Sequence, residues 1–222
     1  MPINARYRGP SDLPGIIPVF PLAGALLLPR GRLPLNIFEP RYLAMIDDAL
    51  RDGHRLVGMI QPEGDREIEP PALFKIGCVG RITQLAESGD GRYIIELTGV
   101  SRFRVEEELD ANTDYRQCRV NYMPFSDDFV ARKGEDDVDR DALLRALTAF
   151  MKANEMQADW DDIAQAPTEA LVNGLSMMSP YGTAEKQALL EAPDLKTRAE
   201  LLVAITEIEL AKKNIEGEPP LQ

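Results

Sequence analysis

The spacing of hydrophobic residues along this 222-residue chain changes near residue 136. Up to about Tyr122 they form short apolar or alternating runs bounded by Gly, Pro, Asp or Asn, which is typical of β-strands. From Asp136 onward they recur at three- and four-residue spacing, which is typical of amphipathic helices. One regular element cannot satisfy both periods, so the pattern predicts a β-rich part followed by a helical part.

Five runs in the first part predict strands: Ile16–Phe20, Leu56–Ile60, Phe74–Thr83, Tyr93–Val100 and Tyr115–Tyr122. The segment Glu87–Arg92 contains Asp-Gly, which supplies the positive φ that a hairpin turn needs. Many short strands with close turn signals favour a small barrel or sandwich. One helix interrupts them, because Pro40 suits a first helical position and Gly53 suits a helix end.

Four apolar stripes in the second part predict helices that pack in a bundle. They include Leu143 with Leu147, Leu171 with Leu175, Leu189 with Leu190, and Leu201 with Ile205. We therefore expect an α+β protein, with a β-barrel domain over residues 1–125 and a helical bundle domain over residues 126–222. Its acidic segment 126–141 is interpreted as a solvated linker that leads into an acidic helix start.

The charge of the chain argues against polyanionic partners. Its formal net charge is -12, and nucleic-acid affinity depends on Lys and Arg that displace counterions from phosphates. Anionic membrane surfaces are disfavoured for the same reason. The first twenty residues lack the apolar core of a signal peptide, and no stretch approaches the ~20 apolar residues that cross a bilayer. We expect a soluble cytoplasmic protein with no nucleic-acid and no membrane partner, in which Cys78 and Cys118 are buried, reduced thiols.

The residues of common catalytic and cofactor sites are missing from the sequence. No glycine is followed by lysine, which excludes a P-loop, and the dinucleotide Gly-x-Gly-x-x-Gly pattern does not occur. His54 is the single histidine, so a histidine-rich metal site or a His-containing triad has little to draw on. Ser11, in Gly9-Pro10-Ser11, lies in a polar tail that offers no fixed base. The sequence predicts no catalytic residue, no metal site and no cofactor.

A resemblance to a known family begins at Ile17-Pro-Val-Phe-Pro-Leu22 and continues through Leu33-Pro-Leu-Asn-Ile-Phe-Glu-Pro-Arg-Tyr42. Gly58–Pro62, Ile76–Ile82 and Gly99–Val105 follow in the same order as strands of that family. Over about residues 13–210 the chain resembles the N-terminal domain of Lon-type ATP-dependent proteases, the peptidase S16 family.

The resemblance implies a PUA-like β pseudobarrel followed by a small helical bundle. In Lon proteases this unit binds unfolded or tagged substrates and helps to assemble the oligomer. The ATPase ring and the Ser-Lys peptidase follow it, and this sequence ends where they would begin. We therefore expect a stand-alone, non-catalytic member of the family.

Polypeptide binding by such a barrel would use apolar or proline-rich loops, through pockets or strand addition. The candidate peptide-binding residues are Leu26, Leu27, Pro29, Pro70, Pro71 and Trp160. Two alternatives stay open. Leu26 to Leu28 can instead form a buried strand, and Trp160, between two aspartates, can instead fill a seam between the two domains.

The sequence therefore favours a polypeptide-recognition module that serves as an adaptor or regulator of proteolysis. Its expected partners are unfolded or non-native polypeptides and a separate ATP-dependent protease, and it can form a homo-oligomer. An RNA-binding PUA-like protein is the first alternative, although the acidic balance opposes it. A small-molecule pocket or a hydrolase built on the barrel is the second, and it would require a deep pocket with perturbed titratable groups.

Overall fold

The longest strand, β7 (Tyr93–Leu109), connects the sheet of this protein. The computed structural model describes residues 5–51, 54–64, 70–155 and 160–216. In it, the first half of β7 lies between β6 (Ile76–Glu87) and β2 (Arg32–Ile37), and its second half pairs with β8 (Gln117–Asn121). These pairings let one strand belong to both ends of the sheet.

Two further strands complete a ring. The strands β3 (Leu56–Ile60) and β1 (Ile16–Pro21) connect β6 to β8, so the order β7-β6-β3-β1-β8 returns to β7, and β2 extends from the ring. The pair β1–β3 is parallel and the others are antiparallel. A short hairpin of β4 (Pro62–Glu63) and β5 (Ala72–Leu73) lies outside it. The ring is the β pseudobarrel that the resemblance predicts.

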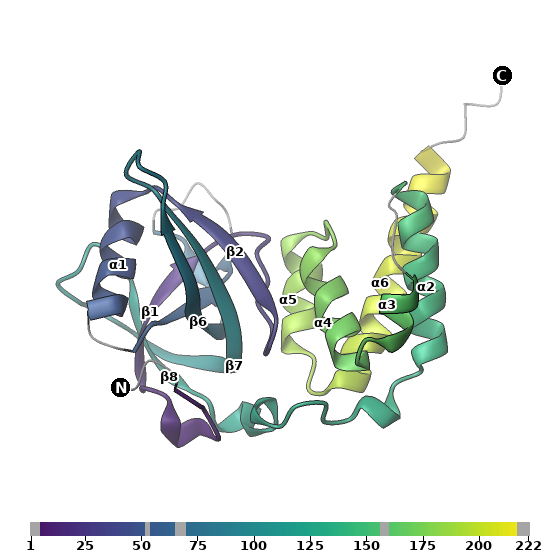
Figure 1. Ribbon diagram of the computed structural model, residues 1–222, viewed down its shortest axis with the longest axis horizontal. Helices are drawn as coiled ribbons and strands as arrows, with labels where there is room; N and C mark the ends of the chain where they lie inside the picture. Colours follow the sequence, from purple (N-terminus) through teal and green to yellow (C-terminus); the bar gives the residue numbers. More distant parts are fainter. Residues whose placement is uncertain (1–4, 52–53, 65–69, 156–159, 217–222) are drawn as a thin grey trace.

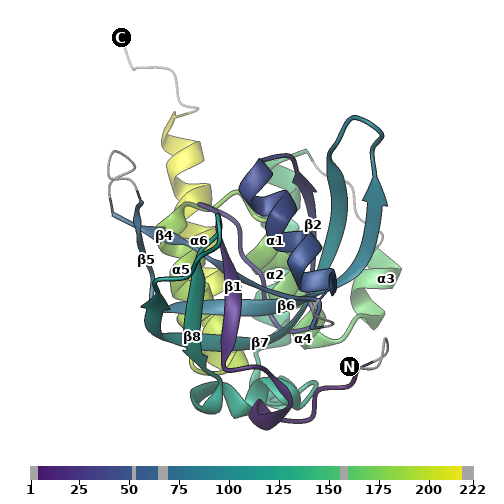
Figure 2. The ribbon, with the colours of Figure 1, turned by 90° about the vertical axis from the view of Figure 1, so that its left-hand side faces the viewer.

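Helix α1 (Pro40–Arg51) covers the barrel on the side away from the later helices (Figure 1). Its buried face contains Tyr42, Met45 and Ile46, and the ring of Tyr42 packs against that of Phe20 with centroids 4.0 Å apart. Its start at Pro40 confirms the prediction from the sequence, whereas Gly53 lies outside the described residues. The view in Figure 2 shows α1 running across the barrel strands.

Among the described residues, five α-helices form the second part of the chain. They are α2 (Arg140–Ala153), α3 (Trp160–Gln165), α4 (Thr168–Met178), α5 (Thr183–Glu191) and α6 (Leu195–Glu216). The long α6 packs against α2, α4 and α5, and α4 and α5 lie beside the barrel (Figure 1). The four predicted apolar stripes are confirmed as α2, α4, α5 and α6, and the short α3 carried no such stripe.

One cluster of buried side chains includes residues of both parts. Leu27 and Leu97 of the barrel belong to it together with Val172 of α4, Leu189 of α5 and Leu202 of α6. A second cluster, which includes the fully buried Phe103, fills the barrel between β1, β3, β7 and β8. The two-part division read from the sequence is visible in the elements, while its boundary between residues 125 and 126 stays a prediction.

The acidic connection between the parts differs from the solvated linker that we expected. It begins with the 3-10 helix Met123–Phe129, in which Phe125 and Asp128 are buried. A second 3-10 helix, Glu135–Asp137, follows, and Asp139 then caps α2 by accepting a hydrogen bond from Ala142 N at 2.9 Å. The interpretation as a solvated linker is wrong at Asp128, because that carboxylate has a buried cationic partner that the composition could not reveal.

Gly99 of β7 holds the loop that precedes β2. Its N–H donates to Gly31 O at 2.8 Å, and its carbonyl accepts from Arg30 N at 2.8 Å. A Cβ atom at this position would overlap the backbone carbonyl of Leu28. The close approach of two backbones therefore requires glycine at residue 99.

Gly99→Ala is expected to destabilise the protein by about 1–3 kcal/mol, because the added methyl group forces two backbone segments apart. Gly15→Ala is the matched control, since a Cβ there meets nothing within 4 Å; it should change the free energy of unfolding by less than about 0.5 kcal/mol. Urea unfolding followed by circular dichroism measures both. Equal stability of the two variants would contradict the close approach.

Candidate functional site

A pocket of about 440 Å³ lies where α4 meets the barrel. Its walls are residues 29–32 before and at the start of β2, residues 131–132 of the connection, and one face of α4. That face carries Ala170, Asn173, Gly174 and Met177, whose spacing places them on one side of a helix. We call this pocket the α4 groove.

The α4 side of the groove is apolar and open. A Cβ at Gly174 would meet no atom within 4 Å, and the side chain of Met178 is 76% exposed. Met177 packs against Gly31, on the barrel side of the groove. Methionine is flexible and polarisable, so it adapts to apolar partners of different shape.

Polar contacts hold α4 and α5 to the barrel around the groove. The side-chain amide of Asn173 donates to Pro29 O at 3.2 Å. From α5, Lys186 donates to Gly24 O at 2.8 Å and to Met177 O at 3.3 Å. Burial lowers the pKa of Lys186 below its ordinary value. The groove therefore lies at a joint whose geometry depends on directed hydrogen bonds.

Arg198 of α6 orients Asn173. Its guanidinium donates to Asn173 Oδ1 at 3.1 Å and to Leu189 O at 2.9 Å. The side chain is 4% exposed, and burial, together with the nearby charge of Arg102, lowers its pKa to about 10. Because the amide oxygen of Asn173 is engaged by Arg198, its NH₂ group is directed to Pro29 on the barrel.

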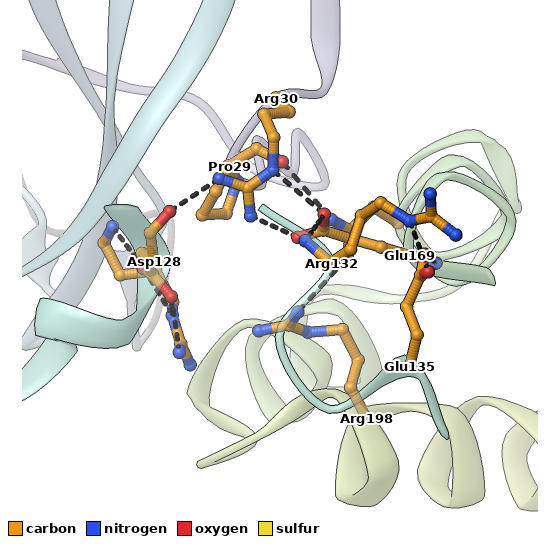
Figure 3. Close-up of polar contacts among 9 residues, drawn as sticks. Pro29, Arg30, Asp128, Arg132, Glu135, Glu169 and Arg198 are labelled. Carbon is orange, nitrogen blue, oxygen red and sulfur yellow. Dashed lines mark hydrogen bonds and ion pairs between the residues drawn. The ribbon is translucent and has the colours of Figure 1, made fainter. Parts of the chain in front are cut away.

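Glu169, in the first turn of α4, joins two arginines at the groove (Figure 3). Its carboxylate accepts from Arg30 Nε at 3.0 Å and from the backbone N–H of Arg132 at 2.9 Å. Its own N–H donates to Glu135 at 2.8 Å. Burial of Glu135 opposes its ionisation, but the hydrogen bonds from Glu169 and Arg132 outweigh that effect and lower its pKa.

Both arginines have left-handed backbones. The φ angle is 65° at Arg30 and 63° at Arg132, a region that favours glycine. Such conformations cost about 1–3 kcal/mol and persist where the surroundings hold them, often at functional sites. The strain therefore adds weight to the α4 groove as the candidate site.

The buried pair Arg102–Asp128 fixes the connection to the barrel. The guanidinium of Arg102 donates to the two carboxylate oxygens from Nε at 3.0 Å and from Nη2 at 2.9 Å. Its Nη1 donates to Leu190 O and Ala192 O at the end of α5, at 3.1 Å and 2.5 Å. One side chain of β7 thus connects three segments.

The residues predicted to bind peptide do not come together. Leu26 and Leu27 are 2% and 1% exposed, so neither presents a surface to a ligand; they are buried, but in an irregular segment rather than in a strand. Pro29 is buried and lines the α4 groove. Pro70 and Pro71 line a separate pocket of about 190 Å³.

Trp160 also lies apart from the α4 groove. It begins α3 and is 46% exposed, so it does not fill a seam between the two parts. The residues that the sequence interpretation missed are Gly174, Met177 and Met178. A glycine inside the apolar stripe of α4 was the signal that could have found them, because glycine in a helix interior usually has a packing or functional reason.

The two cysteines are buried and free. Burial raises the pKa of Cys118 to about 11 and raises that of Cys78 further. Since the thiolate is the nucleophilic form, neither residue is suited to attack a substrate near neutral pH. Their environments fit a structural role.

The fold and the groove define a β-barrel and helical-bundle module with an open groove at the joint of its parts. The chain belongs to the family described as the ATP-dependent protease La (LON) substrate-binding domain, whose profile matches residues 16–207. None of the described helices is both long enough and apolar enough to span a bilayer.

Curated relatives are full Lon proteases. The chain is 28% identical over 205 residues to "Lon protease" of Anaeromyxobacter dehalogenans, covering 87% of this chain and 23% of the relative. It is 33% identical over 206 residues to "Lon protease" of Desulfosudis oleivorans, covering 87% and 24%. The chain thus spans about a quarter of the length of these relatives.

Solved structures share the fold. The N-terminal domain of the Mycobacterium avium complex Lon protease matches with a TM-score of 0.65 at 19% identity, over 86% of this chain and 98% of that one. The Lon N-terminal domain protein from Xanthomonas campestris matches with a TM-score of 0.61 at 22% identity, over 85% and 97%. Both confirm the predicted α+β class.

The buried ion pair leads to a prediction about stability. Asp128→Asn should destabilise the protein by about 3–5 kcal/mol, because it leaves the Arg102 guanidinium buried without its counter-charge. The control is Asp127→Asn, which removes an exposed pair with Lys133 and should cost no more than about 1 kcal/mol. Urea unfolding at neutral pH distinguishes them, and similar midpoints for the two variants would refute the buried pair.

Proposed function

We propose that this chain recognises non-native polypeptide and that the α4 groove accepts an apolar side chain of the bound segment. The observation that carries the proposal is the open, apolar α4 face at Gly174 and Met178, in a chain of a substrate-binding domain family. A volume of about 440 Å³ is in the range of pockets that hold small ligands, about 300–1,000 Å³.

The expected affinity is modest. Burying one Leu or Phe side chain contributes about 1.5–3 kcal/mol, whereas a dissociation constant of 1 mM already requires about 4 kcal/mol. One pocket alone therefore binds weakly, and useful affinity needs further contacts along the client or several modules acting together. Weak, reversible contact suits a protein that samples many unfolded chains.

The same proposal extends to the role of the chain in proteolysis. We propose an adaptor or regulator that presents polypeptide to a separate ATP-dependent protease and has no catalytic activity of its own. The buried thiols with raised pKa values and the single histidine of the sequence support the second point. RNA binding has less support, because the chain has a net charge of -12.

Gly174→Phe should weaken binding of a reduced, alkylated, fluorescently labelled unfolded protein by at least about tenfold, since the ring occupies the groove. Gly174→Ala is the matched control: it adds one methyl group, stabilises α4 by up to about 1 kcal/mol, and should bind nearly as the native chain does. Fluorescence anisotropy gives both affinities. Unchanged binding by the Phe variant, with native-like circular dichroism, would remove the groove from the proposal.

Salt dependence provides a second test. Polypeptide binding driven by apolar burial should change less than about threefold between 50 and 200 mM salt, whereas a protein that contacts several phosphates loses orders of magnitude. Titrations of the labelled unfolded protein and of a labelled RNA at both salt concentrations measure this. Gel analysis of the same samples, with ATP added, should show an intact client. Tight, salt-sensitive RNA binding without polypeptide binding would favour the alternative function, and client cleavage abolished by a point mutation in this chain would contradict the non-catalytic role.

A further inference from the structure

We infer that the α4 groove prefers apolar segments whose neighbouring residues are acidic, an inference that rests on the proposed function. Three arginines, at residues 30, 32 and 132, line the groove together with one glutamate, at residue 169. The charge of its lining is therefore three minus one, or +2, in a chain whose net charge is -12. Glu135 pairs with Arg132 from outside the lining, so the basic island next to this apolar surface is centred on Arg32.

Arg32 is the residue best placed to act on a client. It begins β2 and is exposed, and within the described parts of the chain no carboxylate forms an ion pair with it. Arg30 and Arg132, by contrast, already pair with Glu169 and Glu135. A carboxylate next to the bound apolar side chain can therefore pair with Arg32 without displacing an internal partner.

The paired arginines help to shape this preference. Arg30 and Arg132 hold left-handed backbones that glycine would adopt without strain, and each uses its side chain to hold the wall of the groove. Arg30 reaches both Glu169 and the backbone carbonyl of Asp128, the latter at 2.6 Å from Nη1 (Figure 3). The carboxylates of Glu169 and Glu135 offset most of the charge of these two arginines, so their contacts hold the wall of the groove while Arg32 supplies the positive charge that a client meets.

The electrostatic attraction at the groove acts over a short distance, which favours a polypeptide over a polyanion. Salt screens charges over about 8 Å at physiological ionic strength, so the island acts on carboxylates within a few residues of the bound side chain. A nucleic acid extends further and meets the acidic remainder of the surface. Acidic side chains beside an apolar residue can pair with Arg32 without reaching the acidic remainder of the surface, which would repel them.

Short peptides of equal length test the preference. Each carries the same central Phe-Leu pair and blocked termini, and the flanking residues are Glu, Gln or Lys. Competition against the labelled unfolded protein measures their affinities for the native chain and for Arg32→Gln. Arg104→Gln is the control, because it removes the same charge from an exposed site on β7 that does not line the groove.

The Glu peptide should bind the native chain about two- to fivefold more tightly than the Gln peptide, as expected for an exposed ion pair, and the Lys peptide should bind most weakly. This difference should vanish in Arg32→Gln, persist in Arg104→Gln and shrink at high salt.

Three failures are distinguishable. If the Glu, Gln and Lys peptides compete equally and Gly174→Phe abolishes all three, the acidic preference is wrong while the groove remains a binding site. If no peptide competes and Gly174→Phe has no effect on binding of the unfolded protein, the groove is not the binding site; if the native chain does not bind the unfolded protein at all, the proposed function itself is wrong. A preference that survives Arg32→Gln would also overturn the assignment to Arg32.

Discussion

The rest of the structure depends on the buried contact between Arg102 and Asp128. Arg102 belongs to a barrel strand, Asp128 to the connection, and the carbonyls of Leu190 and Ala192, which the same guanidinium contacts, to the end of α5. A charge this deeply buried is tolerated only when its hydrogen-bonding capacity is met by fixed partners. It therefore specifies one orientation of the helices relative to the barrel, which apolar packing alone would leave less defined.

This orientation determines the character of the α4 groove. The joint is held by polar contacts from Asn173, Lys186 and Arg30, so the apolar atoms of Gly174 and Met178 are left at the surface instead of closing the seam. Packed cores bury such atoms, whereas binding surfaces retain them. The same arrangement places three arginines in the lining of the groove, so the apolar surface and these charges lie in one place.

The β-then-helix order, the hairpin at residues 87–92 and the helix at Pro40 could be predicted because each is encoded locally, by period or by turn chemistry. The site could not. For Leu26 and Leu27 the sequence left two interpretations open, a ligand-binding loop and a buried strand. Their burial depends on long-range packing among barrel and helix residues, which no local pattern specifies. The charge of Asp128 predicted an exposed side chain, because its partner, Arg102, lies 26 residues away in the sequence. Among the groove residues, a mid-helix glycine was the single local clue.

The closure of the barrel also delays the pairing of its first strand during synthesis on the ribosome. The first strand pairs with the last, Ile16 opposite Arg119 and Ile17 opposite Cys118, so β1 waits for about a hundred residues before its partner is synthesised. At about 5–20 residues per second this takes on the order of 5–20 s. During that interval the apolar β1 can pair with β3 alone, and an emerging chain with one open strand edge is the kind of client that general chaperones bind.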